Sequence, residues 1–294
     1  MAADAAAVTE VIAAVESSLY GPSTFSQTDL VGEWAELDVG RDTHVVRDGD
    51  RIVAYAMLRE WGGSWRAEGY VHPDAVGRGI GTMIVARLEA DVARRGGGRL
   101  RHGVLEADQA GRQLFQSLGY RPARVFREMR IELEAPPPAA EWPPGLHVTP
   151  FDPARDAAAF HAAYEDACAD HWDHVARDLA SWSRINLETG RFDAALCCVL
   201  RAGDEIAAGT ICAGDTFGGG WVHILFTRRA WRRRGVGAGL LRDAFARLWA
   251  RGERSVGLGV DTANATGAFA LYERAGMEPA MGWVVYEKHL TGRA

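Results

Sequence analysis

The sequence has few cysteines, and they form no pattern that is typical of a metal site or a disulfide framework. Cys168, Cys197, Cys198 and Cys212 are the four cysteines among 294 residues, and no Cys-x-x-Cys pair occurs. Adjacent residues in a strand point to opposite faces, so Cys197 and Cys198 are poorly placed to share one ion. We expect small core residues in a reduced, cytoplasmic protein that binds no metal.

The sequence also lacks a long hydrophobic run and an excess of positive charge. The alanine-rich segment 1–19 has no basic start and is interrupted by Asp4, Glu10 and Glu16. It predicts an amphipathic helix rather than a secretory signal or a membrane span. The formal net charge is −6, whereas a nonspecific nucleic-acid binder normally carries a basic excess. We therefore expect neither DNA nor a membrane as a partner, and the oligomeric state is not indicated.

A glycine-rich turn at 231–241, W-R-R-R-G-V-G-A-G-L-L, lies between an apolar run at 221–227 and a segment of helical periodicity at 238–250. A strand, a glycine turn and a helix in this order predict a phosphate site, because backbone N–H groups and the helix N-terminus face the ligand. The absence of Gly-Lys-Ser/Thr argues against a Walker loop. Asp261 leaves a dinucleotide-binding turn as an alternative.

Two motifs in the same order resemble the GCN5-related N-acetyltransferase (GNAT) superfamily. Arg232-x-x-Gly235-x-Gly237 is similar to its Arg/Gln-x-x-Gly-x-Gly/Ala turn. Asn264, followed by L-Y-E-R-A-G-M at 271–277, is similar to its second signature. The resemblance implies an α/β (α+β) fold, a mixed and mostly antiparallel sheet flanked by helices, with acetyl-CoA as co-substrate.

An internal repeat indicates two copies of this domain. A proline-rich segment at 135–145 separates the copies and predicts a semi-rigid linker, which gives an N-terminal domain at 1–134 and a C-terminal domain at 146–294. The matching positions are Gly79 with Gly235 and Arg95 with Arg251, both at an offset of 156, Leu114 with Leu271 at 157, and Gly49 with Gly203 at 154.

The resemblance implies that the second copy holds coenzyme A with the turn and with the strand before it. Backbone N–H groups and the arginine run would bind the pyrophosphate, and one strand N–H would stabilise the thioester oxygen. A solvated face or an RNA patch is the alternative for the arginines, and a helix N-cap is the alternative for Asn264. The implied cofactor-binding residues are Leu225, Phe226, Thr227, Arg232, Arg233, Arg234, Gly235, Val236, Gly237, Ala238 and Asn264.

Acetyl transfer from a thioester to an amine calls for an acid and a base, since the amine has a pKa near about 10 and the thiol one near about 8.5. Tyr272 matches the family tyrosine and is the implied acid, with simple packing as the alternative. His223 alternates onto the same strand face as Leu225 and is the candidate base. The family often has a carboxylate on this strand, so a structural role for His223, with water as the proton acceptor, remains an alternative.

The acceptor pocket of this fold usually lies by the first two helices, which places D-H-W-D-H at 170–174 there. Asp170, His171 and Trp172 are the predicted substrate-binding residues, because acids attract an ammonium and an indole ring stacks on it. The spacing of His171 and His174 lacks a third ligand and does not indicate a metal.

The first copy lacks parts of the predicted site. Val76 stands where the family has Arg or Gln, Ala107 replaces the motif asparagine, and Phe115 replaces Tyr272. A phenyl ring cannot donate a proton, so we expect a non-catalytic domain that either binds coenzyme A or is structural only. Its candidate coenzyme residues are Arg78, Gly79, Ile80, Gly81 and Thr82.

A degenerate copy followed by a complete one is similar to the tandem, two-domain acetyltransferases of the superfamily. We expect an acetyl-CoA-dependent N-acetyltransferase that acts on the primary amine of a small molecule by direct attack in the C-terminal domain. Two alternatives are an acyltransferase that takes its donor from a carrier or a tRNA, and a non-enzymatic acetyl-CoA sensor.

Overall fold

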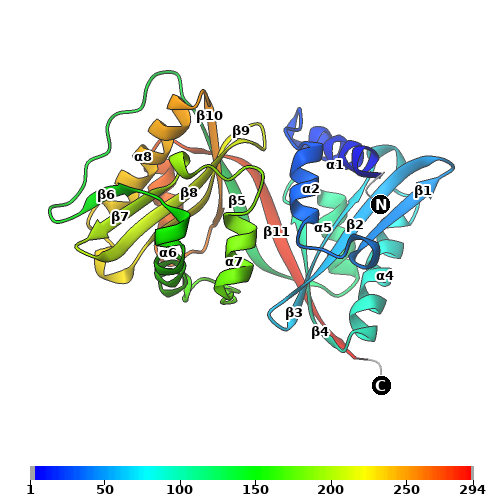
Figure 1. Cartoon of the computed structure of the whole chain (residues 1–294). Helices are drawn as coiled ribbons and strands as arrows, with labels where there is room; N and C mark the ends of the chain where they lie inside the picture. Colours follow the sequence, from blue (N-terminus) through cyan, green and yellow to red (C-terminus); the bar gives the residue numbers. More distant parts are fainter. Residues whose placement is uncertain (1–3, 293–294) are drawn as a thin grey trace. The chain divides into compact units, whose positions relative to one another are not determined.

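The structure, a computed structural model, describes residues 4–292, which form two compact units of strands and helices (Figure 1). Unit 1 contains the chain up to Arg127, with Asp261–Ala263 and the chain from Ala280 onward. Unit 2 contains Glu128–Val260 and Asn264–Pro279. Each unit is a mixed, mostly antiparallel sheet flanked by helices, which confirms the predicted fold class.

Unit 1 buries both faces of its sheet under helices. Along β2, Ala54, Ala56 and Leu58 contribute to one apolar cluster with α4, and Tyr55 and Met57 contribute to another with α1 and α2. Its elements are α1 (Ala5–Tyr20), α2 (Gln27–Trp34), α3 (Val39–Asp42), β1 (Thr43–Asp48), β2 (Arg51–Trp61), β3 (Ser64–Val71), η2 (Pro73–Ala75), α4 (Ile80–Arg94), β4 (Gly97–Leu105), α5 (Gln109–Ser117), β5 (Arg121–Glu132), which continues into unit 2, and β11 (Glu278–Thr291).

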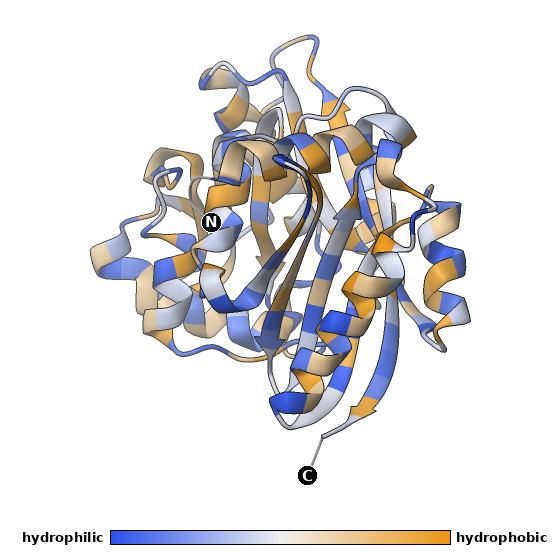
Figure 2. Ribbon diagram, turned by 90° about the vertical axis from the view of Figure 1, so that its right-hand side faces the viewer, coloured by the Kyte–Doolittle hydropathy of each residue, from blue (hydrophilic) through white to orange (hydrophobic). Residues whose placement is uncertain are grey.

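Unit 2 repeats this arrangement with strand order β5-β10-β9-β8-β7-β6. Hydrophobic and hydrophilic residues alternate around the helices and along the strands, as expected for elements with one buried face (Figure 2). Its remaining elements are β6 (His147–Pro150), α6 (Pro153–Cys168), α7 (Leu179–Asn186), η3 (Ala194–Leu196), β7 (Cys198–Ala202), β8 (Glu205–Thr216), β9 (Gly219–Thr227), η4 (Arg229–Trp231), α8 (Val236–Ala250), β10 (Ser255–Asp261) and α9 (Ala268–Arg274).

The two copies exchange their closing strands. In unit 1, β11 from the second copy pairs antiparallel with β4, from Trp283 opposite Leu105 to Thr291 opposite Gly97. In unit 2, the part of β5 from Glu128 onward is the strand beside β10. The compact units therefore differ from the continuous domains 1–134 and 146–294 that the sequence predicts.

The repeat is visible in backbone geometry as well as in sequence. The hairpin glycines Gly49 and Gly203 both have φ of 60°. The register of β1 and β2 shifts after Val46, and that of β7 and β8 shifts after Leu200, again 154 residues later. Matching turns and bulges at one offset show that both copies fold on the same plan.

Two local details complete the fold. Ser26 caps α2, because its hydroxyl accepts from the N–H of Asp29 while the Asp29 carboxylate accepts from the N–H of Ser26. The four cysteines are free and buried, which confirms them as core residues. Within residues 4–292, no helix combines the length and the apolar character that a bilayer crossing needs.

Candidate active site

The glycine turn of unit 2 leaves the start of α8 open to a ligand. Gly235 is the N-cap, with φ of 82°, and within the described part of the chain no side chain caps the helix. A Cβ on Gly237 would lie 3.0 Å from Leu271 Cδ2, so this position also favours glycine. First-turn N–H groups without a protein acceptor fit a pyrophosphate at this place.

The arginines of the turn have different roles in the structure. Arg232 Nε donates to the carbonyl oxygen of Thr227 (3.1 Å), and its Nη2 donates to the carbonyl oxygen of Ala167 (2.7 Å). Arg232 therefore ties the end of β9 to the end of α6. The guanidinium of Arg234 lies over the ring of Trp231, 4.9 Å from its centroid.

Arg233 has a left-handed backbone, with φ of 58°. The residue 156 positions earlier is Gly77, whose φ is 82°. A residue other than glycine in this region costs roughly 1–2 kcal/mol. The second copy thus holds an arginine side chain at this turn in spite of local strain, which is typical of functional sites.

The strands on either side of the predicted thioester position pair only briefly. The described parallel ladder between β9 and β10 joins Gly220 with Val256 and Trp221 with Gly257. Leu225, Phe226 and Thr227 lie beyond this ladder and pair with β8 on their other side. Alternate N–H groups of an antiparallel strand point away from its partner, so this part of β9 presents backbone donors toward the β10 side.

Tyr272 lies beside this part of the sheet. It is 7% exposed and belongs to an apolar cluster with Leu258 of β10, against which Leu225 of β9 packs. Burial, with a smaller contribution from Cys168, raises the pKa of Tyr272 to about 12. The hydroxyl therefore remains protonated at neutral pH and can donate a hydrogen to a developing thiolate.

Cys168, at the end of α6, is a neighbour of Tyr272 that the sequence did not predict. Burial is the main cause that raises the pKa of this thiol to about 12, and Glu165 also raises it, whereas a hydrogen bond with Tyr164 lowers it. The thiol is therefore uncharged at neutral pH. The spacing of Tyr164 and Cys168, four residues apart on one helix, was the available sequence signal.

His223 lies on β9 and is exposed to solvent. Neighbouring protein atoms that displace part of its water, followed by the charge of Arg191, lower the pKa of His223 below its ordinary value. The imidazole is therefore neutral at pH 7 and can accept a proton, but it is a weaker base than a free histidine. The assignment of His223 as the base stays a prediction.

The acceptor segment follows α6 as a loop. Asp170 forms an ion pair with Arg229, and the N–H of His171 donates to the carbonyl oxygen of Cys168 (2.8 Å). Trp172 is half-buried. The sequence did not predict Glu165, whose carboxylate contacts His174 of this loop at 2.7 Å.

Asn264 closes a turn before α9. Its Oδ1 accepts from the N–H of Thr266 (2.8 Å) and from the hydroxyl of Thr266 (2.6 Å). Gly267, and not Asn264, is the N-cap of α9. The helix-cap alternative is therefore wrong, and the contact with the pantetheine arm stays a prediction.

The turn of unit 1 has the same glycine geometry as the turn of unit 2. Gly79 is the N-cap of α4 with φ of 78°, and a Cβ on Gly81 would lie 2.9 Å from a side-chain carbon of Leu114. The side chain of Arg78 pairs with Asp48 at 2.8 Å. Phe115 is at the sequence position equivalent to Tyr272, so this position carries no hydroxyl.

These features are those of an acyltransferase, and the comparisons with known proteins give its family. An acetyltransferase (GNAT) domain model matches residues 40–122, and the acetyltransferase (GNAT) family model matches residues 157–277. The chain belongs to the GNAT acetyltransferase family, with two such domains in tandem, and it is an enzyme of the acyltransferase class.

Relatives of the same organisation support this assignment. Mycothiol acetyltransferase of Thermobispora bispora is 33% identical over 78% of this chain and 77% of its own length. Mycothiol acetyltransferase of Streptomyces scabiei is 30% identical over 84% and 77%. The crystal structure of a GCN5-related N-acetyltransferase from Sphaerobacter thermophilus has a TM-score of 0.84 at 29% identity, over 100% of this chain and 95% of that one.

Proposed function

We propose that the chain transfers an acetyl group from acetyl-CoA to the primary amine of a small molecule, and that unit 2 carries the active site. The observation that supports the proposal is the buried Tyr272, which shares an apolar cluster with Leu258 of β10 and follows Leu271, the residue that approaches Gly237 of the glycine turn. Unit 1 has Phe115 at the equivalent position. The name shared by the relatives makes a mycothiol-related amine the first acceptor to test.

In this mechanism the amine attacks the thioester carbon directly. A C–N bond forms, the C–S bond breaks, and the departing sulfur takes a proton from the hydroxyl of Tyr272. A backbone N–H among Leu225, Phe226 and Thr227 stabilises the charge on the carbonyl oxygen. The turn at 233–238 holds the pyrophosphate and thereby positions the thioester for attack.

The experiment combines binding and turnover. Calorimetric titration with acetyl-CoA should show one molecule bound per chain, at unit 2. A stoichiometry of two molecules per chain would show that unit 1 also binds the coenzyme. Free-thiol release is then followed across a panel of amines. Binding without release for any amine would instead favour a sensor, and activity only with carrier- or tRNA-bound acyl groups would favour the alternative donor.

A further inference from the structure

The carboxylate of Glu165 lies between two histidines on the acceptor side of unit 2. His174 Nε2 is 2.7 Å from Glu165 Oε2, and His161 Nε2 is 3.5 Å from Oε1. The N–H of Arg177 donates to Oε1 at 3.3 Å. The three side chains are mostly buried, so the carboxylate and the two imidazoles hold a defined arrangement.

This arrangement determines the tautomer of His174. An ionised carboxylate only accepts hydrogen bonds, so the hydrogen between the two groups resides on His174 Nε2. The Nδ1 atom of the neutral ring then carries a lone pair. In many enzymes, a histidine that accepts a proton with one ring nitrogen is oriented by a carboxylate at its other ring nitrogen.

The ring of Tyr164 lies between His174 and the part of β9 that the proposed function places beside the thioester. The ring of Tyr164 lies 6.4 Å from that of His174 and 6.1 Å from that of Phe226, one of the strand residues beside the predicted thioester. Tyr164 is also hydrogen-bonded to Cys168, which is close enough to Tyr272 to affect its pKa. Arg232 anchors this end of α6 to the strand that leads into the coenzyme turn.

We infer that His174, oriented by Glu165, is the general base of unit 2. The inference rests on the proposed function and replaces His223 in that role. The Nδ1 atom of His174 takes one proton from the acceptor ammonium, which frees the nitrogen lone pair for attack, and the imidazolium later returns this proton to solvent. As the amide forms, the nitrogen gives its second proton through solvent to the Tyr272 phenolate, which restores the hydroxyl that protonated the sulfur.

Several charged or titratable groups surround His174. Glu165, Tyr164 and His161 face it from α6. Asp173 and Arg177 flank it in the loop. Glu165 supplies the carboxylate that is in direct contact with the His174 ring.

The test uses His174→Gln in the full-length chain. The glutamine amide can still donate to Glu165, which preserves the loop contact, but it has no basic nitrogen. We expect a loss of about 10²–10⁴ in kcat/KM for the amine, an unchanged Kd for acetyl-CoA, and loss of the acidic limb of the pH profile. His147→Gln is the control, because His147 is exposed on β6, away from Glu165 in the sequence, and within the described part of the chain it contacts no residue of the proposed site, and we expect activity within about twofold of wild type.

Two measurements make the outcome decisive. In ¹⁵N spectra of the wild-type protein, His174 should carry its hydrogen on Nε2, and the opposite tautomer would overturn the assignment even if the variant failed to fold. A His174→Gln protein that keeps its rate and its acidic limb would also overturn it. A wild type that binds acetyl-CoA but releases no thiol with any amine would contradict the proposed function itself, and the inference with it.

Discussion

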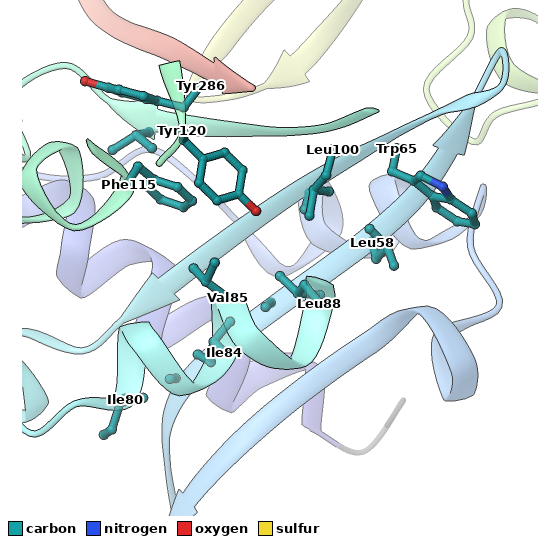
Figure 3. Close-up of a cluster of buried hydrophobic side chains, with 14 of the residues drawn as sticks. Leu58, Trp65, Ile80, Ile84, Val85, Leu88, Leu100, Phe115, Tyr120 and Tyr286 are labelled. Carbon is teal, nitrogen blue, oxygen red and sulfur yellow. The ribbon is translucent and has the colours of Figure 1, made fainter. Parts of the chain in front are cut away.

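The ring of Tyr286 stacks on the ring of Phe115, with the centroids 5.9 Å apart and the planes at 22° (Figure 3). Tyr286 comes from β11 at the end of the second copy, is 0% exposed, and lies in the same apolar cluster as Leu88 and Leu100 of the first copy. In return, Met129 of β5 is 0% exposed in the cluster that contains Tyr272. Each core is therefore incomplete without a strand from the other copy.

Cleavage of the linker should leave the two halves of the chain together. A protease site inserted in 135–145 separates the copies covalently, but the fragments still share the ladder of β11 with β4 and the place of β5 beside β10. We expect one peak in size-exclusion chromatography and thiol release within about twofold of the uncut protein, which serves as the control. Fragments that separate without denaturant would contradict the strand exchange.

Replacement of Arg233 by glycine should relieve strain and weaken coenzyme binding. Removal of a left-handed non-glycine residue gains roughly 1–2 kcal/mol, and the added backbone freedom of glycine offsets roughly 0.5–1 kcal/mol of this. We expect a free energy of unfolding higher by about 0.5–1 kcal/mol, measured by urea denaturation, and a Kd for acetyl-CoA raised about five- to tenfold, measured by calorimetry. Gly77→Ala, at the equivalent turn of unit 1, should instead destabilise the protein. An unchanged Kd would remove Arg233 from the coenzyme site.

Replacement of Tyr272 by phenylalanine should lower kcat by about 10–100-fold without affecting acetyl-CoA affinity. The ring keeps its place in the apolar cluster, and only the hydroxyl donor is lost. Steady-state thiol release and calorimetry separate the two effects. Phe115→Tyr, at the equivalent position of unit 1, is the matched control and should not change the rate. An equal rate in Tyr272→Phe would mean that the sulfur obtains its proton elsewhere.

The free energy of unfolding of unit 1 should decrease as the pH is lowered, because of His102. The side chain is 1% exposed, and among the residues that the structure describes its Nε2 has no hydrogen-bond partner. Burial lowers the pKa of His102 to about 3, whereas the unfolded chain has a pKa near about 6.5. The stabilisation is therefore complete above pH 6.5, and below it roughly 1.4 kcal/mol is lost for each pH unit until about pH 3.

His102→Leu tests this pH dependence, since the second copy has Leu258 at the equivalent position, 156 residues later. Leucine cannot titrate, so urea denaturation of the variant should show a flatter pH dependence between 6.5 and 3 and a higher stability at pH 4. Measurements near pH 8 are the control, because there the free energy of unfolding of both proteins should change little with pH. Identical slopes at low pH would mean that other groups cause the loss.

Much of the fold follows from local sequence. The glycines at 235 and 237 need a left-handed backbone or a close approach of Leu271, so their spacing alone predicts the turn. The helix after the turn follows from periodicity, and the assignment of Tyr272 as the acid follows from the resemblance. The spacing of Glu165 and Cys168 on one helix could also have placed them near each other. It could not have predicted that Glu165 contacts His174.

The sequence by itself determined the repeat, the strand, turn and helix over 221–250, and the difference between Tyr272 and Phe115. Only the tertiary structure decided that β11 completes unit 1 and that β5 completes unit 2, because alternation along a strand specifies which face is buried and not which sheet edge it joins. The same holds for the contact of Glu165 with His174 and for the contact of Arg232 with Ala167. These contacts join residues that only the packing of α6, its following loop and the turn brings together.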